Sequence, residues 1–196
     1  EATQTLYYID ILGKSIHKYV PASNTHTKAV LEKNVALIVP VAGTKDKFLI
    51  SQDRDLAIVT WDGVSPKASN IKKIAEGDTA PGLEGNRFND GKADPSGRLW
   101  VGTMGAEPIR GQIAQNMGTL YSLEKKNQLK AHLSPVSISN GLAWNAALKK
   151  FYYIDSSTYE IHQFDFDIDN GTISNKQTIF TFEKHNIPGL PDGQCI

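Results

Sequence analysis

One pentapeptide occurs twice in this chain in nearly the same form, and this repeat constrains the fold more than any other feature of the sequence. Leu6–Asp10 matches Phe151–Asp155 at four of five positions. Each copy is followed by an alternating segment that contains an Ile-His pair, at Ile16-His17 and at Ile161-His162. We therefore expect several copies of one small β-rich unit.

The spacing of the repeat predicts the architecture. Equivalent apolar runs begin at Leu6, Phe48, Leu99 and Phe151, in steps of 42, 51 and 52 residues. A period of roughly 40–50 residues with about four short strands is typical of a β-propeller blade. A β-sandwich is the alternative, but it needs no such period. We expect four-stranded antiparallel blades, with the starts of the strands at Leu6, Leu99 and Phe151 nearest the propeller axis.

Composition narrows the classes of function. Twenty-one basic residues balance 21 acidic ones, which argues against a nucleic acid or a membrane surface as partner. One cysteine excludes an internal disulfide framework and a zinc site with several cysteines. No apolar run approaches the ~18 residues of a membrane span, and no segment has a clear helical apolar stripe. The sequence is therefore that of an all-β globular protein.

Three polar residues recur in step with the repeat. Asn89, Asn140 and Asp192 stand in Asn-Asp-Gly, Asn-Gly and Asp-Gly sequences, 51 and 52 residues apart. Such dipeptides also occur as simple turns, but three in register predict oxygen atoms that converge on one site. Oxygen ligands without cysteine or paired histidine suit a hard cation such as Ca²⁺ or Mg²⁺. Arg87, two residues before Asn89, either holds substrate oxygens with it or forms a surface ion pair.

Longer motifs resemble a known family. The chain is similar to the regucalcin (senescence marker protein)/gluconolactonase/luciferin-regenerating enzyme family over essentially all 196 residues, and its end looks like the insect branch. The resemblance implies a six-bladed β-propeller with a divalent metal, usually Ca²⁺, and lactone hydrolysis in several members. The motifs that carry it are Asn86–Pro95, Gly102–Met104, Ser139–Trp144, Phe180–His185 and Pro191–Gly193.

The resemblance also implies residue roles. Asn140 and Asp192 match metal ligands, and Asp192 matches the catalytic proton donor or acceptor. Arg87 and Asn89 match substrate contacts. Glu107 matches a substrate-binding glutamate more weakly, because its loop is variable. A further metal ligand of the family, a glutamate in a Glu-Gly-Pro motif, has no counterpart in this sequence.

The predicted function is hydrolysis of a small sugar lactone that depends on a divalent metal. Ca²⁺ is the expected cofactor, with Zn²⁺, Mg²⁺ or Mn²⁺ as alternatives. The alternatives in function are a luciferin-regenerating activity and a non-catalytic calcium-binding protein. Substrate contacts around the metal favour an enzyme, since a structural ion needs none.

The sequence also predicts the domain organisation, the oligomeric state, the location and the partner of the protein. We expect residues 1–196 to form a single, incomplete β-propeller domain of about four blades, because six blades need about 300 residues. We also expect a cytoplasmic monomer whose partner is the small-molecule lactone.

Overall fold

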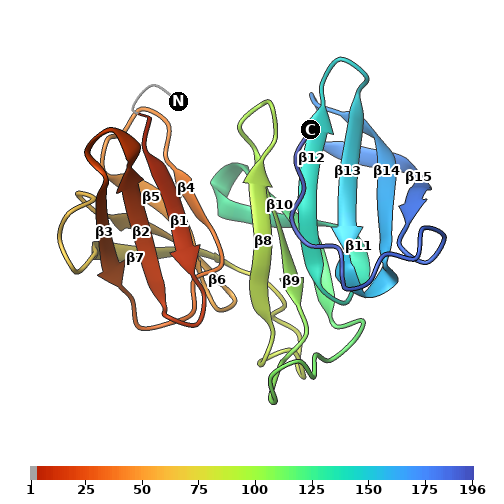
Figure 1. Cartoon of the computed structure of the whole chain (residues 1–196), viewed down its shortest axis with the longest axis horizontal. Helices are drawn as coiled ribbons and strands as arrows, with labels where there is room; N and C mark the ends of the chain where they lie inside the picture. The colour runs from red at the N-terminus through yellow and green to blue at the C-terminus, as the bar shows by residue number, and fades with distance from the viewer. Residues whose placement is uncertain (1–3) are drawn as a thin grey trace. The chain divides into compact units, whose positions relative to one another are not determined.

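Short antiparallel sheets make up residues 4–196, the part of the chain that the computed structural model describes (Figure 1). One sheet has three strands and three sheets have four. Contacts divide the chain into two compact units, Glu1–Glu76 and Gly77–Ile196, which are described in turn. No helix in the described range has the length and apolar character needed to cross a membrane.

The first unit contains two sheets with an apolar core. Tyr7 and Ile9 of the first sheet pack on a buried cluster that includes Ile16, Phe48 and Trp61. The strand orders are β1-β2-β3 and β4-β5-β6-β7. The elements are β1 (Leu6–Asp10), β2 (Ser15–Val20), η1 (Pro21–Ser23), β3 (Thr25–Val30), β4 (Ile38–Pro40), β5 (Lys47–Gln52), β6 (Asp55–Thr60) and β7 (Ser69–Glu76).

The second unit repeats this plan with two four-stranded sheets. Its core includes Trp100, Leu142, Phe151 and Phe166, and the rings of Trp100 and Phe151 lie 5.4 Å apart. The strand orders are β8-β9-β10-β11 and β12-β13-β14-β15. The elements are β8 (Arg87–Ala93), β9 (Leu99–Met104), β10 (Gly118–Glu124), η2 (Lys125–Asn127), β11 (Gln128–Val136), β12 (Ser139–Asn145), β13 (Lys150–Asp155), η3 (Ser156–Thr158), β14 (Glu160–Asp167) and β15 (Thr172–Thr181).

The prediction that the repeated apolar runs lie nearest the axis was wrong for the runs at Leu99 and Phe151, which are not edge strands. The runs at Leu99 and Phe151 form β9 and β13, which pair with strands on both sides. The edge positions before them belong to β8 and β12. A fully apolar strand is favoured in the sheet interior because its two faces and both its edges are covered there. The run at Leu6 forms β1, an edge of the three-stranded sheet.

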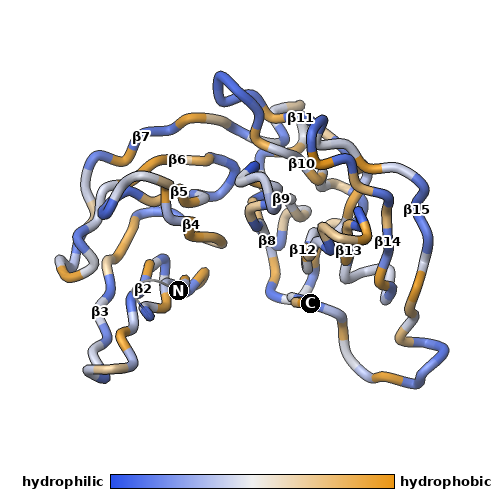
Figure 2. Tube along the Cα trace, turned by 90° about the horizontal axis from the view of Figure 1, so that it is seen from above, coloured by the Kyte–Doolittle hydropathy of each residue, from blue (hydrophilic) through white to orange (hydrophobic). Residues whose placement is uncertain are grey.

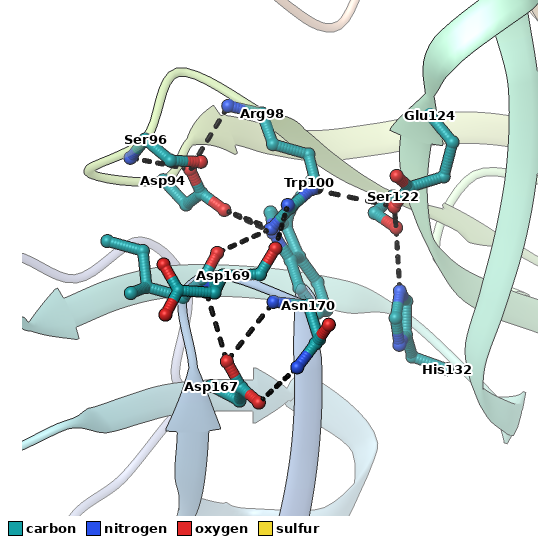
Figure 3. A network of polar contacts seen from close by, with 11 residues as sticks. Asp94, Ser96, Arg98, Trp100, Ser122, Glu124, His132, Asp167, Asp169 and Asn170 are labelled. Carbon is teal, nitrogen blue, oxygen red and sulfur yellow. Dashed lines mark hydrogen bonds and ion pairs between the residues drawn. The ribbon is translucent and has the colours of Figure 1, made fainter.

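A buried polar network anchors the turn between β8 and β9 (Figure 3). The Asp94 carboxylate accepts hydrogen bonds from the backbone N–H groups of Ser96 and Arg98, and from the indole N–H of Trp100 at 3.1 Å. Its other bonds come from the Ser96 hydroxyl and the Arg98 guanidinium. Arg98 also donates to the carbonyl of Ile168 in the turn after β14. The network thus joins the two sheets of this unit.

His132 closes this network on the other side of Trp100. Its ring stacks on the indole with centroids 4.2 Å apart, and its Nε2 lies 2.7 Å from the hydroxyl of Ser122. Ser122 gives its own proton to Glu124, so Nε2 carries the hydrogen in this contact. Burial lowers the pKa of His132 to about 4, and the charge of Lys130 adds to this effect.

This environment predicts a loss of stability in mild acid. The unfolded chain protonates His132 near pH 6.5, but the folded chain does so only near pH 4. Between these values the unfolded chain binds more protons than the folded chain, so the free energy of unfolding falls as the pH falls. We expect His132→Gln to reduce the slope of unfolding free energy against pH between pH 7 and pH 4.5, measured by urea denaturation. Part of the slope should remain, because burial also lowers the pKa values of His17 and His162. An unchanged slope would contradict the prediction.

Candidate active site

A β-bulge occurs at the same place in the two edge strands of the second unit. On β8, Asn89 and Asp90 together face one position of β9, between the pairs Phe88–Thr103 and Gly91–Val101. On β12, Gly141 is the extra residue after Asn140. Bulges turn side chains out of the regular alternation and are frequent beside active sites. The 51-residue spacing of the two asparagines therefore corresponds to one repeated backbone feature.

The two bulges face each other. β8 and β12 are in contact and run side by side, with the C-terminal residue beside them (Figures 1 and 2). The Asn89 side-chain N–H₂ donates to Asn140 Oδ1 at 3.1 Å and to the backbone carbonyl of Ser139 at 2.9 Å. Arg87 donates to Asn89 Oδ1 at 2.8 Å, so the residues predicted to bind substrate and metal form one hydrogen-bonded row.

The row continues to the C-terminal segment. Asn140 Nδ2 donates to the hydroxyl of Ser156 at 2.7 Å, and this hydroxyl donates to the Pro191 carbonyl at 2.6 Å. Gln194 Nε2 donates to the Gly141 carbonyl at 2.8 Å. A Cβ atom at Gly141 would come within 2.8 Å of the Asp192 carbonyl oxygen, so only glycine lets this segment lie so close to β12. The contacts bring Asp192 to the bulge of β12.

Asp90 is a site residue that the analysis of the sequence missed. It follows Asn89 in the bulge and is half-buried, and it accepts a hydrogen bond from the N–H of Gly91. Burial raises the pKa of Asp90, and the negative charge of Asp192 raises it further. The two carboxylates are therefore close enough to affect each other. The Asn-Asp-Gly sequence concealed this role because it resembles an ordinary turn.

Glu107 makes its hydrogen bond within its own loop. It is exposed in the loop between β9 and β10, and its carboxylate accepts a hydrogen bond from the N–H of Gly111 in the same loop at 2.7 Å. Hydrogen bonds thus bring together Arg87, Asn89, Asn140 and the segment with Asp192, whereas Glu107 is bonded to Gly111 of its own loop.

The chemistry of the donor atoms fits a hard cation. Asn140 is only 7% exposed, and its bond to Ser156 uses the amide nitrogen, so its oxygen faces Asn89. Asp90 belongs to the bulge of β8, and Asp192 belongs to the segment that lies against Gly141. A set of oxygen atoms from such residues suits Ca²⁺ or Mg²⁺. Residues 4–196 contain no group of three or more His, Cys, Asp or Glu side chains that could hold a metal. The amide oxygens would therefore have to contribute.

The arrangement can bind and orient a small polar molecule. A guanidinium beside an amide recognises hydroxyl or carboxylate oxygens, and a carboxylate at the edge can move a proton. The amide orientations are fixed by bonds to neighbouring groups. Fixed donors and acceptors favour a defined substrate orientation.

A family model and curated relatives both match the whole of this chain. A family model described as the SMP-30/Gluconolactonase/LRE-like region matches residues 1–196. Regucalcin of Oryctolagus cuniculus is 34% identical over 202 residues, which cover 100% of this chain and 62% of that protein. The chain thus spans less than two thirds of the length of this relative.

Solved structures show the same similarity. A luciferin-regenerating enzyme is 45% identical with a TM-score of 0.93, and the match covers 100% of this chain and 62% of that one. A calcium-binding protein, regucalcin from Agrobacterium tumefaciens, is 24% identical with a TM-score of 0.82, over 99% and 60% of the two chains. Matching structures also include a protein described as a propeller. The predicted fold class, an all-β propeller of which this chain covers about four of six blades, is confirmed.

Proposed function

Because the chain belongs to the SMP-30/Gluconolactonase/LRE-like family, we propose that it carries part of the active site of a divalent-metal-dependent hydrolase of small sugar lactones. The observation that carries this proposal is the hydrogen-bonded row Arg87–Asn89–Asn140, in which residues of the two predicted roles contact one another. A purely structural ion would not need an arginine and a second amide held against its ligand. We also propose that residues 1–196 belong to one β-propeller domain.

In this proposal, the polar residues bind the substrate, bind the metal or transfer the proton, and Asp192 does both of the last two. Arg87 and Asn89 hold hydroxyl groups of the substrate and so fix the orientation of the lactone ring. Asn140 and Asp192 would hold the metal, which when bound would polarise the lactone carbonyl and stabilise negative charge on its oxygen. Glu107 would bind a further hydroxyl by exchanging its bond to Gly111 for one to the substrate.

Asp192 moves the proton. The oxygen of a water molecule attacks the carbonyl carbon while the Asp192 carboxylate accepts a proton from that water. The ring C–O bond then breaks, and Asp192 returns the proton to the oxygen that leaves. The products balance as one hydroxy acid from one lactone and one water. Its exposed position leaves this carboxylate accessible to water.

The proposal is tested by assaying hydrolysis of an aldonolactone by the complete natural protein, with and without a chelator of divalent metals. We expect Arg87→Ala to raise KM by roughly 10- to 100-fold, the scale of a lost charged hydrogen bond, with a smaller effect on kcat. Arg110→Ala removes an exposed arginine from the loop after β9 and serves as the control. Hydrolysis that is insensitive to the chelator would contradict the metal dependence.

Two other functions are alternatives to this proposal. The 45% identity to a luciferin-regenerating enzyme favours a related activity on another cyclic substrate. The calcium-binding description of the Agrobacterium protein fits a non-catalytic calcium-binding role as well as it fits a calcium-dependent enzyme. A luciferin-regeneration assay tests the first, and Ca²⁺ binding without lactone hydrolysis would support the second. A monomeric state and a cytoplasmic location stay predictions from the sequence.

A further inference from the structure

We propose that Ser156 is a positioning residue that sets both the amide orientation of Asn140 and the position of the segment that carries Asp192. The proposal rests on the function proposed above, in which these two residues hold the metal. Ser156 itself would touch neither metal nor substrate. It would act only through the two groups to which its hydroxyl is bonded.

The hydroxyl of Ser156 is buried and fully engaged. Ser156 is 2% exposed and begins η3, directly after β13. Its backbone N–H donates to the carbonyl of Ile138 at 3.1 Å, which ties the residue to the position just before β12. Its hydroxyl oxygen lies 2.7 Å from Asn140 Nδ2 and 2.6 Å from the Pro191 carbonyl oxygen.

The direction of these bonds determines which end of the Asn140 amide faces the site. The carbonyl of Pro191 can only accept, so the single hydroxyl proton of Ser156 is donated to it. The oxygen of the hydroxyl must then accept from Asn140, and an amide can donate only through its nitrogen. Asn140 Oδ1 is therefore directed to the other side, where Asn89 Nδ2 lies at 3.1 Å. Asn89 and Ser156 thus select the same orientation of the amide from its two ends, and without Ser156 only the contact with Asn89 would hold it.

The same hydroxyl holds the backbone next to Asp192. The segment after Leu190 forms no strand, so it lacks the regular hydrogen bonds of a sheet. Two bonds tie it to the sheet of β12, one from Ser156 to the Pro191 carbonyl and one from Gln194 to the Gly141 carbonyl. The first is attached to the residue immediately before Asp192. Loss of this bond should increase the mobility of the backbone at Asp192, while the packing of the apolar core should change little.

The test compares Ser156→Ala with Ser157→Ala in the complete natural protein. Ser157 is the next residue of η3, and its described hydrogen bond is made by its backbone N–H to Asp155. We expect Ser156→Ala to weaken Ca²⁺ affinity by roughly 5- to 100-fold in calorimetry, the scale of a lost buried hydrogen bond. The NMR order parameters of the backbone N–H groups at Asp192–Gln194 should also fall, because the segment becomes more mobile. Ser156→Thr, which keeps a hydroxyl, should restore them.

The outcomes separate this proposal from the proposed function. Order parameters are measured without metal or substrate, so a wild-type protein that hydrolyses no lactone would remove the proposed function but not this test. Lower order parameters at Asp192–Gln194 in Ser156→Ala alone support the positioning role. Order parameters that stay unchanged, or that fall equally in Ser157→Ala, overturn it, and unchanged Ca²⁺ affinity in Ser156→Ala overturns its effect on Asn140.

Discussion

Replacing Asp192 with asparagine should lower kcat for lactone hydrolysis by roughly 10²–10⁴-fold in the complete natural protein, the usual scale of general-base catalysis. Asparagine keeps an oxygen atom that can face the metal, but it cannot accept a proton from water. Because substrate contacts through Arg87 and Asn89 are untouched, KM should change much less than kcat. The measurement is steady-state kinetics at a saturating concentration of divalent metal.

A matched control and a metal titration complete this experiment. Asp169→Asn makes the same chemical change at an exposed turn after β14 and should leave kcat unchanged. Calorimetry on the Asp192 variant shows whether the metal is still bound under the assay conditions. Turnover at the wild-type rate with the metal bound would leave Asp192 a ligand only and remove it from proton transfer.

Replacing Asp94 with alanine should lower the free energy of unfolding by about 3–5 kcal/mol, as expected when one partner of a buried ion pair is removed. The Asp94 side chain is 0% exposed and accepts from Arg98, Trp100 and two backbone N–H groups (Figure 3). Its removal would leave the Arg98 charge and the Trp100 indole N–H without this acceptor in the interior. Urea denaturation measures the loss.

The turn after β14 provides the control for Asp94. Asp167 accepts hydrogen bonds from the backbone N–H groups of Asp169 and Asn170 in a similar turn, but it is exposed. Asp167→Ala should therefore reduce the free energy of unfolding much less than Asp94→Ala, because the hydrogen bonds of Asp167 form in contact with solvent. Equal losses in the two variants would show that burial of Asp94 does not strengthen its bonds.

Periodicity in the sequence was sufficient to predict the propeller, but not all of its strands. The apolar runs of β9 and β13 were recognised because nearly all their side chains are buried. The outer strands β7, β11 and β15 were not identified, since most of their residues face solvent and lack apolar alternation. The edge strands β8 and β12 were missed in part because they carry the polar residues of the site.

The candidate site was predictable from the spacing of the repeat and, for Arg87, from its place beside Asn89. Asn89 and Asn140 were identified by their common spacing, and the structure places both at equivalent bulges. Ser156 was not identified, because it reaches Asn140 only through the hairpin of β12 and β13. A signal existed, however: after the matching pentapeptides, the first copy continues with Ile11 and the second with Ser156. A polar residue where its repeat partner is apolar indicates a local function.

The hydrogen bonds of the site have a common direction. From the Arg87 guanidinium through Asn89, Asn140 and Ser156 to the Pro191 carbonyl, each group accepts from the one before and donates to the next. Such a string of aligned dipoles begins at a positive charge, and each bond polarises the following one. Substitutions along it will combine non-additively. Directed evolution of this site will therefore require pairs of substitutions that keep the donor-to-acceptor direction of these hydrogen bonds.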